Sequence, residues 1–308
     1  MIIGLGRVGI RHFESVMKLN TISQIDCIDP DLEKIQKASS LIAQEQKIKI
    51  NLYHNFESIE KDYDFLVLAT TADIRLDVLK TIIKKTKIKF SIFEKVLAQS
   101  QEDLNEFIEL SSNFKRSWVN TPMGQIDLYK KLKKKINISS VKEVYFSNFR
   151  GLACNAIHFI DFVSSWKKML PIKINSKELN KNWIKAERVG FYDIHGKLEI
   201  YYQDETKLTL ISPEISEEYH CKILTSKNTW TLIEKEKIFF LDGGEKYFGK
   251  VNYQSEMTNM LVEEIQNTGN CTLPTLEWSV KCHAPLIESL LEHWNLCNLN
   301  KSKRLPIT

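Results

Sequence analysis

The sequence places a lysine and a histidine where each could act on a reacting oxygen. Lys95 follows the apolar run Phe90–Phe93 after one intervening residue, so we expect it at the carboxyl end of a parallel strand, the edge at which such sheets bind ligands. A lysine there can hydrogen-bond a hydroxyl and stabilise negative charge on its oxygen. His158 lies in an apolar helix and can carry a proton near neutral pH. The plainer alternatives are an exposed strand-end lysine and a structural histidine.

A glycine-rich turn at the start of the chain predicts a dinucleotide site. In Gly4-Leu5-Gly6-Arg7-Val8-Gly9, the first glycine allows a sharp turn, the second lets the backbone approach a pyrophosphate, and the third lets the next helix pack closely. Val8, His12, Val16 and Leu19 are expected on one face of that helix. An ordinary strand-to-helix turn is the alternative.

Asp29 supports the dinucleotide interpretation. It stands 20 positions after Gly9, at the end of the second predicted strand, where a carboxylate can accept both ribose hydroxyls of an adenosine and repels a 2′-phosphate. Pro30-Asp31 supply no cation to hold such a phosphate. We therefore expect NAD rather than NADP. The expected cofactor-binding residues are Gly4, Gly6, Arg7, Val8, Gly9, Asp29, Thr70, Thr71, Glu94 and Lys95.

The elements that must position these residues alternate between strand and helix over the first ~120 residues, which is typical of an α/β, Rossmann-type doubly wound parallel sheet. Only three residues precede Gly4, against about five to six in an ordinary strand, so further residues are expected before Met1. The carboxyl ends of the strands bring Thr70-Thr71, Glu94-Lys95 and Asn120-Thr121 to the cofactor edge. Residues 1–121 are predicted to form this NAD-binding domain.

Residues 122–308 are predicted to form an α+β domain for substrate binding and oligomerisation, built on an open, mainly antiparallel sheet. A helix near Asn155–Trp166 precedes strands joined by short turns, and two helices, Tyr253–Gly269 and Thr275–Asn298, end the chain. The predicted strands are Val141–Phe149, Arg188–Ile194, Lys197–Tyr202, Lys207–Ile211, Tyr219–Thr225, Thr229–Glu234 and Lys237–Leu241. Apolar residues on the outer sheet face, among them Phe191, Ile200, Tyr202, Leu208 and Leu210, predict a homodimer or homotetramer.

Composition narrows the other functions. The net charge of +4 comes from intermixed acids and bases, which argues against a nucleic-acid surface. The lysines of 130–135 surround Leu128, Leu132 and Ile136, which recur at helical spacing, as on a solvated helix face. The six cysteines are scattered without a C-x-x-C pair, so neither a disulfide framework nor a metal site is expected. No leader and no membrane-length apolar run is present, and a cytoplasmic location is expected.

Residues along nearly the whole chain resemble the Gfo/Idh/MocA oxidoreductases. The glycine turn followed by His12 is similar to the family's opening fingerprint, Glu94-Lys95 to its Glu-Lys-Pro motif, and His158-Phe159-Ile160-Asp161 to its His-x-x-Asp. The stretch from Tyr253 through Glu277 and His283 is similar to the closing helices of members that act on sugars.

The resemblance implies an NAD-dependent oxidoreductase that moves a hydride between the nicotinamide and a secondary alcohol or ketone of a sugar, sugar nucleotide or polyol. Lys95 and His158 would be its catalytic residues, and Lys95, Cys154, Asn155 and His158 its substrate contacts. The expected partner is a small sugar-type molecule, with no nucleic acid and no membrane.

Three positions depart from the family pattern. Cys154 stands where an aspartate usually precedes the histidine by four residues, Val96 replaces the proline, and Arg75 matches a histidine often found after the fourth strand. A thiol offers no carboxylate, so proton transfer would depend on His158. The alternative function is a nucleotide-binding protein of the same fold that no longer turns over and acts as a binding or regulatory partner.

Overall fold

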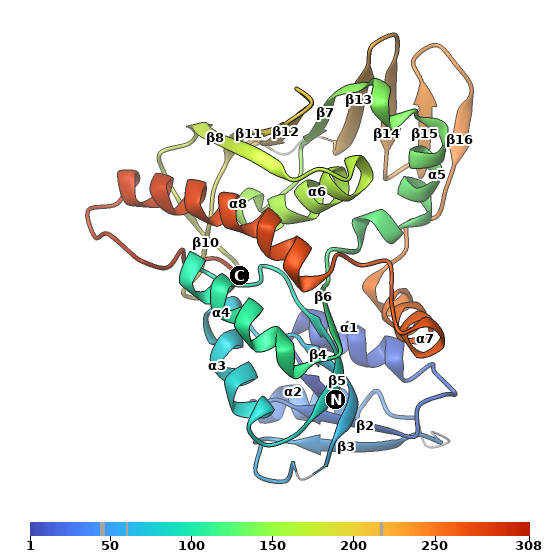
Figure 1. Ribbon diagram of the computed structural model, residues 1–308, viewed down its shortest axis with the longest axis vertical. Coiled ribbons are helices and arrows are strands. Elements are labelled where there is room, and N and C mark those ends of the chain that lie inside the picture. The colour runs from blue at the N-terminus through green and yellow to red at the C-terminus, as the bar shows by residue number, and fades with distance from the viewer. Residues whose placement is uncertain (44–46, 60, 216–217) are drawn as a thin grey trace. The chain divides into compact units, whose positions relative to one another are not determined.

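Two large sheets and a two-stranded one organise the chain, which a computed structural model describes over residues 1–43, 47–59, 61–215 and 218–308 (Figure 1). The described residues group into two compact units. The first comprises Met1–Leu97, Glu106–Asn120 and Asn252–Leu276, and the second Ala98–Asn105, Thr121–Val251 and Glu277–Thr308. The expected division of the chain into two domains, residues 1–121 and 122–308, stays a prediction.

The first unit contains a six-stranded, entirely parallel sheet in the order β3-β2-β1-β4-β5-β6. This is the strand order of dinucleotide-binding sheets, and it confirms the predicted doubly wound fold. Residues Leu66, Val67 and Leu68 are all buried, because a parallel sheet is covered on both faces. The strands are β1 (Ile2–Ile3), β2 (Gln24–Ile28), β3 (Lys49–Tyr53), β4 (Tyr63–Leu68), β5 (Ile88–Phe93) and β6 (Arg116–Val119).

Local signals set several helix ends. Ser100 accepts a hydrogen bond from the amide of Asp103 at 3.1 Å, as expected for the residue that caps α4, and Gly269 closes α7 in the left-handed conformation with φ 70°. The residues expected on one face of α1 are not all buried. Val8 is 38% exposed, whereas His12 and Val16 are buried. These helices are α1 (Arg7–Val16), α2 (Leu32–Ser39), α3 (Ala72–Ile83), α4 (Gln101–Leu110) and α7 (Thr258–Thr268).

The second unit contains an eight-stranded mixed sheet in the order β16-β15-β14-β13-β7-β12-β11-β8, in which only the β7–β12 pair is parallel within the described residues. Its strands are β7 (Val141–Ser147), β8 (Pro171–Leu179), β11 (Gly196–Tyr202), β12 (Lys207–Ser212), β13 (His220–Thr225), β14 (Thr229–Ile233), β15 (Ile238–Leu241) and β16 (Lys246–Phe248). The helices are α5 (Asp127–Lys135), α6 (Leu152–Lys167) and α8 (Leu276–Cys297).

Some strands differ from the expectation. The segment Arg188–Ile194 is mostly irregular, and only β10 (Tyr192–Asp193) pairs, with β9 (Ile184–Lys185). Strands β8, β9 and β16 were not expected. Strand β8 lies at the sheet edge with most of its side chains partly or fully exposed, so it lacks the apolar alternation that identifies a half-buried strand.

The five residues predicted to form an apolar outer face of this sheet do not lie on it, so that prediction is wrong. All five residues assigned to it are buried, and Phe191 lies outside the strands of the sheet. The hydroxyl of Tyr202 lies 3.1 Å from Ser164 Oγ on α6, which shows that the side of β11 that carries Ile200 and Tyr202 faces the helix. Successive strand residues point to opposite faces, and several of the alternate positions carry charge. Lys207 Nζ lies 2.5 Å from Glu143, and Lys197 Nζ 3.3 Å from Glu199. The homodimer or homotetramer stays a prediction, but an apolar outer sheet face no longer supports it.

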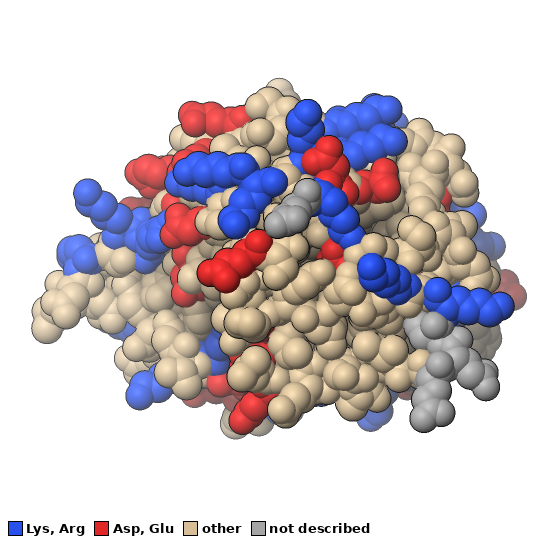
Figure 2. All heavy atoms as spheres, turned by 90° about the horizontal axis from the view of Figure 1, so that it is seen from below, with Lys and Arg blue, Asp and Glu red and all other residues tan. Residues whose placement is uncertain are grey.

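Charged side chains elsewhere are also mixed in sign. Helix α5 buries Leu128 and Leu132 and exposes most of its lysines, and Lys131 pairs with Asp127 at 2.9 Å. On the face shown in Figure 2, basic and acidic side chains are interspersed. Among the described residues, no helix is both long and apolar enough to cross a membrane.

Candidate functional site

The glycine turn has a geometry that only glycine permits. Gly4 has φ 89°, and a Cβ built on it would lie 2.8 Å from the carbonyl carbon and oxygen of Ala69. A Cβ on Gly9 would lie 1.8 Å from the carbonyl oxygen of Gly4. Gly6 is the N-cap residue of α1 and has no side chain to cap the first amides. The start of α1 is therefore open backbone of the kind that binds phosphate.

Asp29 is joined directly to this turn. Its Oδ2 accepts a hydrogen bond from the amide of Leu5 at 2.7 Å, and its Oδ1 accepts one from the amide of Asp31 at 3.0 Å. The residue is 4% exposed. The structure thus brings the predicted ribose-binding carboxylate to the predicted phosphate-binding turn.

A cation lies near Asp29, although Pro30-Asp31 supply none. Lys34, on the first turn of α2, places its Nζ 3.5 Å from Asp29 Oδ1 and 3.3 Å from Asp31 Oδ2. The lysine is three residues after Asp31, which is one turn of helix, so helical spacing could have identified it.

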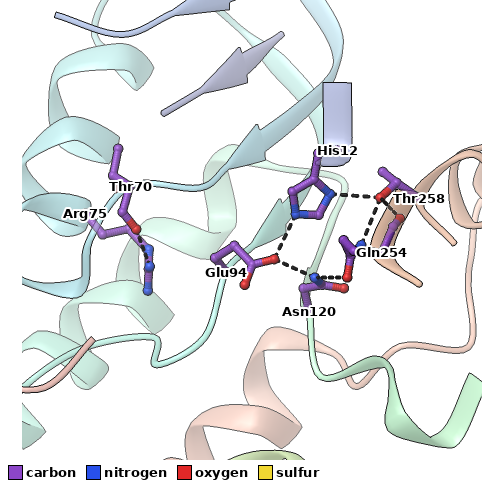
Figure 3. Close-up of polar contacts among 7 residues, drawn as sticks. All are labelled: His12, Thr70, Arg75, Glu94, Asn120, Gln254 and Thr258. Atoms are coloured by element: carbon purple, nitrogen blue, oxygen red, sulfur yellow. Dashed lines mark hydrogen bonds and ion pairs between the residues drawn. The ribbon is translucent and has the colours of Figure 1, made fainter. Parts of the chain in front are cut away.

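A buried ring of polar side chains holds the residue that precedes Lys95 (Figure 3). Glu94 Oε1 lies 2.8 Å from His12 Nε2 and accepts a hydrogen bond from Asn120 Nδ2 at 2.5 Å. Thr258 Oγ1 lies 2.8 Å from His12 Nδ1, and Gln254 lies within 3.0 Å of both Asn120 and Thr258. The ring joins α1, the ends of β5 and β6, and the start of α7.

The ring also keeps Glu94 ionised. Burial alone would raise the pKa of Glu94, but the hydrogen bonds and charge of His12, together with the amide of Asn120, outweigh burial and lower that pKa below its usual value. The carboxylate therefore acts as a fixed acceptor inside the fold. Its role in the structure is to anchor the end of β5, whereas direct cofactor binding by Glu94 stays a prediction.

Arg75 anchors the other side of Lys95. Its side chain is 1% exposed, and its guanidinium donates to the carbonyl oxygens of Thr70, Val96 and Leu97. Figure 3 shows the Thr70 contact. The backbone on both sides of Lys95 is thus fixed by side chains from other elements, and Lys95 itself is partly exposed. The sequence identified Arg75 only as a departure from the family pattern.

Helix α6 carries the second set of predicted residues. Cys154, Asn155 and His158 are partly exposed and lie within its first two turns. Asn155 Nδ2 donates to the carbonyl of Arg150 at 2.9 Å. Cys154 Sγ donates to Asp193 Oδ2 at 3.1 Å, a contact that the sequence did not predict because 39 positions separate the two residues.

Asp161, also on α6, serves the interior of the second unit. It is 1% exposed and accepts hydrogen bonds from Thr121 Oγ1 at 2.7 Å and Ser279 Oγ at 3.0 Å. Burial raises the pKa of Asp161 to about 6, against the opposing hydrogen bonds. Thr121, expected at the cofactor edge, belongs to this interior network.

The structure therefore assembles the predicted residues as two groups. The first unit holds the glycine turn, Asp29, Thr70, Thr71, Glu94 and Lys95, and the second holds Cys154, Asn155 and His158. The part of the chain that the structure describes contains no cluster of three or more His, Cys, Asp or Glu side chains that could hold a metal. All six cysteines lie within it and form no disulfide.

The fold has many counterparts among solved structures. An oxidoreductase from Agrobacterium radiobacter, in complex with NAD+, L-tartaric acid and magnesium, aligns with TM-score 0.73 and 12% identity over 96% of this chain and 95% of its own. The WlbA dehydrogenase from Bordetella pertussis, in complex with NADH and UDP-GlcNAcA, aligns with TM-score 0.69 and 14% identity over 100% of this chain and 98% of its own.

A third counterpart is a super-repressor mutant of Gal80p from Saccharomyces cerevisiae, with TM-score 0.69 and 15% identity over 95% of this chain and 94% of its own. No model of a known protein family matches the sequence, and no curated protein matches it. The likeness in structure confirms the fold that the sequence resemblance implied, the one shared by oxidoreductases of the Gfo/Idh/MocA type.

Proposed function

We propose that the protein is an NAD-dependent oxidoreductase that transfers a hydride between the nicotinamide and a secondary alcohol or ketone of a sugar, sugar nucleotide or polyol. The observation that carries the proposal is the hydrogen bond of Asp29 to the amide of Leu5, which joins a ribose-binding carboxylate to a phosphate-binding glycine turn. The neighbours from A. radiobacter and B. pertussis, solved with NAD+ and NADH, support NAD as the cofactor.

The first unit fits a dinucleotide in two further respects. The backbone around Gly4 and Gly9 leaves no room for side chains, as expected where backbone amides must approach a pyrophosphate. Thr70 Oγ1 is buried and has no hydrogen-bond partner among the described residues, so a ligand group at this strand end would satisfy it. When bound, NAD supplies the hydride acceptor, and the protein supplies geometry and charge.

Lys95 and His158 have separate tasks in this proposal. The Lys95 ammonium stabilises negative charge that develops on the reacting oxygen, and its position is set by Glu94 on one side and by Arg75, through Val96, on the other. His158 takes the hydroxyl proton during oxidation and returns it during reduction. Cys154 and Asn155, which precede His158 on α6, complete the proposed substrate contacts. UDP-GlcNAcA in the WlbA structure supports a sugar-nucleotide substrate.

The second candidate is a nucleotide-binding regulator without turnover. Cys154 at the start of α6, together with the similarity to Gal80p in a super-repressor form, supports it. Single-turnover measurement of NADH formation across a panel of sugars, sugar nucleotides and polyols tests the two functions. Hydride transfer to NAD+ supports the enzyme, whereas NAD+ binding without reaction on any member of the panel supports the regulator. A cytoplasmic location is part of the proposal.

A further inference from the structure

Polar side chains from two elements meet above Gly151 at the start of α6. A Cβ built on Gly151 would lie 2.8 Å from Cys154 Sγ, 2.9 Å from Asn155 Nδ2 and 3.0 Å from Asp193 Oδ2. Gly151 has φ 78°, a backbone conformation that residues other than glycine rarely adopt. The thiol, the amide and the carboxylate are therefore packed together over bare backbone, with His158 one helical turn beyond Cys154.

The carboxylate of Asp193 is fixed on every side. It is 7% exposed, and its Oδ1 accepts hydrogen bonds from the amides of Ala153 and Ile194, both at 2.8 Å. Its Oδ2 accepts the bond from Cys154 Sγ at 3.1 Å. The amide of Ala153 belongs to the first turn of α6, so Asp193 supplies from β10 the capping oxygen that Gly151 cannot supply.

Strand β10 is itself held in place by neighbours within the second unit. The amide of Tyr192 donates to the carbonyl of Pro306 at 2.8 Å, and its ring packs against Trp294 with the centroids 5.0 Å apart. On the other strand of the pair, Ile184 lies opposite Asp193. Asp193 is thus held against α6 by backbone pairing and aromatic packing.

Two electrostatic effects act in opposite directions on the Cys154 thiol. The N-terminus of a helix carries about half a positive charge and favours a thiolate. A carboxylate within hydrogen-bond distance carries a full negative charge and disfavours one. The nearby amide of Ala153 already donates to Asp193, which further reduces the effect of the helix. The carboxylate therefore dominates.

We propose that Asp193 is a positioning residue that holds Cys154 as a protonated, hydrogen-bonding thiol one turn before His158. The consequence rests on the proposed function, because a thiolate close to a carbonyl product would add to its carbon, whereas a protonated thiol would not. Position 154 is thus a neutral surface for the substrate, with the carboxylate behind it.

Alkylation by iodoacetamide tests this pair, since only the thiolate reacts. The background is Cys297→Ser, because Cys154 and Cys297 are the two partly exposed cysteines and the other four are buried. Mass spectrometry measures the rate of alkylation at Cys154 as a function of pH. The titratable groups near the thiol are Asp193, which faces it from β10, and His158, which lies one turn further along α6. The variant Asp193→Asn should move the midpoint at least about one pH unit lower and raise the rate below the midpoint about tenfold.

The control variant Asp242→Asn removes the same charge from an exposed turn and should leave the profile unchanged. A rate that rises by one factor at every pH, or a change below twofold, would overturn the proposal, because either shows that the Asp193 charge does not act on the thiol. If Asp193→Asn does not fold, the wild-type midpoint is compared with that of the urea-unfolded chain. A higher native midpoint supports the proposal, and an equal or lower one contradicts it.

This experiment needs neither substrate nor cofactor. If Cys154 is alkylated as predicted but the protein transfers no hydride, the proposal about the thiol–carboxylate pair stands and the proposed enzymatic function fails. If the protein transfers hydride but the alkylation of Cys154 does not depend on Asp193, the enzymatic function stands and the proposal about the pair fails.

Discussion

His12 Nε2 lies 2.8 Å from the carboxylate of Glu94 in the interior of the first unit. Glu94 is the residue directly before Lys95 in the chain. The pair closes the polar ring that joins α1 to the end of β5. Since both side chains are buried, each depends on the other to satisfy a group that water cannot reach.

Removal of the histidine should therefore destabilise the protein substantially. The variant His12→Ala leaves the Glu94 carboxylate buried with a lost partner, and breaking such a pair costs about 3 kcal/mol or more. Glu94→Gln should lose less stability, because the amide oxygen still accepts hydrogen bonds from His12 and Asn120. Urea unfolding measures the free energy of unfolding of both variants. Arg11→Ala, which breaks an exposed pair with Glu14, is the control and should change stability by less than about 1 kcal/mol. Equal losses for His12→Ala and Arg11→Ala would contradict this account.

Cofactor preference should depend on Asp29 and Lys34 in opposite ways. Calorimetric titration should show tighter binding of NAD(H) than of NADP(H), because Asp29 accepts ribose hydroxyls and repels a 2′-phosphate. Asp29→Asn should narrow the preference. Lys34→Ala should widen it, since it removes the cation 3.5 Å from Asp29 that would attract the phosphate. Equal or tighter NADP(H) binding by the wild type would show that the role given to Asp29 is wrong.

Asp161 should make the folded protein more stable in mild acid than in base. Burial raises its pKa to about 6, so the folded state holds this proton more tightly than the unfolded chain does. The resulting stability is present below about pH 4 and lost as the pH rises through 6. Asp161→Asn removes the penalty and should stabilise the protein at pH 8 by up to about 3 kcal/mol. The gain should shrink toward pH 4 in urea unfolding, and a gain that is equal at both pH values would rule this out.

The predictable parts of this protein are those with local or periodic signals. The parallel sheet of the first unit, the cap at Ser100 and the left-handed end of α7 at Gly269 follow from apolar runs and from turn chemistry. Arg75 could not be assigned in this way, because a charged helical residue is ordinarily exposed and only the fold brings three carbonyl groups to it. Asp193 is a similar case, since no local pattern relates it to Cys154.

That contact makes a specific prediction for the position at which the resembled family has an aspartate. In Cys154→Asp the new carboxylate would stand against Asp193, and like charges at this distance oppose each other. The single variant should therefore lose stability and turnover. The double variant Cys154→Asp with Asp193→Asn should recover much of both, because only one carboxylate remains. Thermal melting and single-turnover rates measure the recovery. A single variant that turns over faster than the wild type would show that Asp193 does not constrain position 154.

Catalysis itself should depend on Lys95 and His158. Each alanine variant should slow the hydride step by roughly 10²–10⁴-fold, the range for loss of a general acid–base group. His158→Ala should leave NAD affinity nearly unchanged, because the proposed NAD-binding residues lie in the first unit and His158 in the second. His220→Ala, on β13 of the second unit, is the matched control and should react at close to the wild-type rate. Single-turnover NADH formation measures all three, and a His158→Ala protein that reacts as fast as the wild type would show that another group moves the proton.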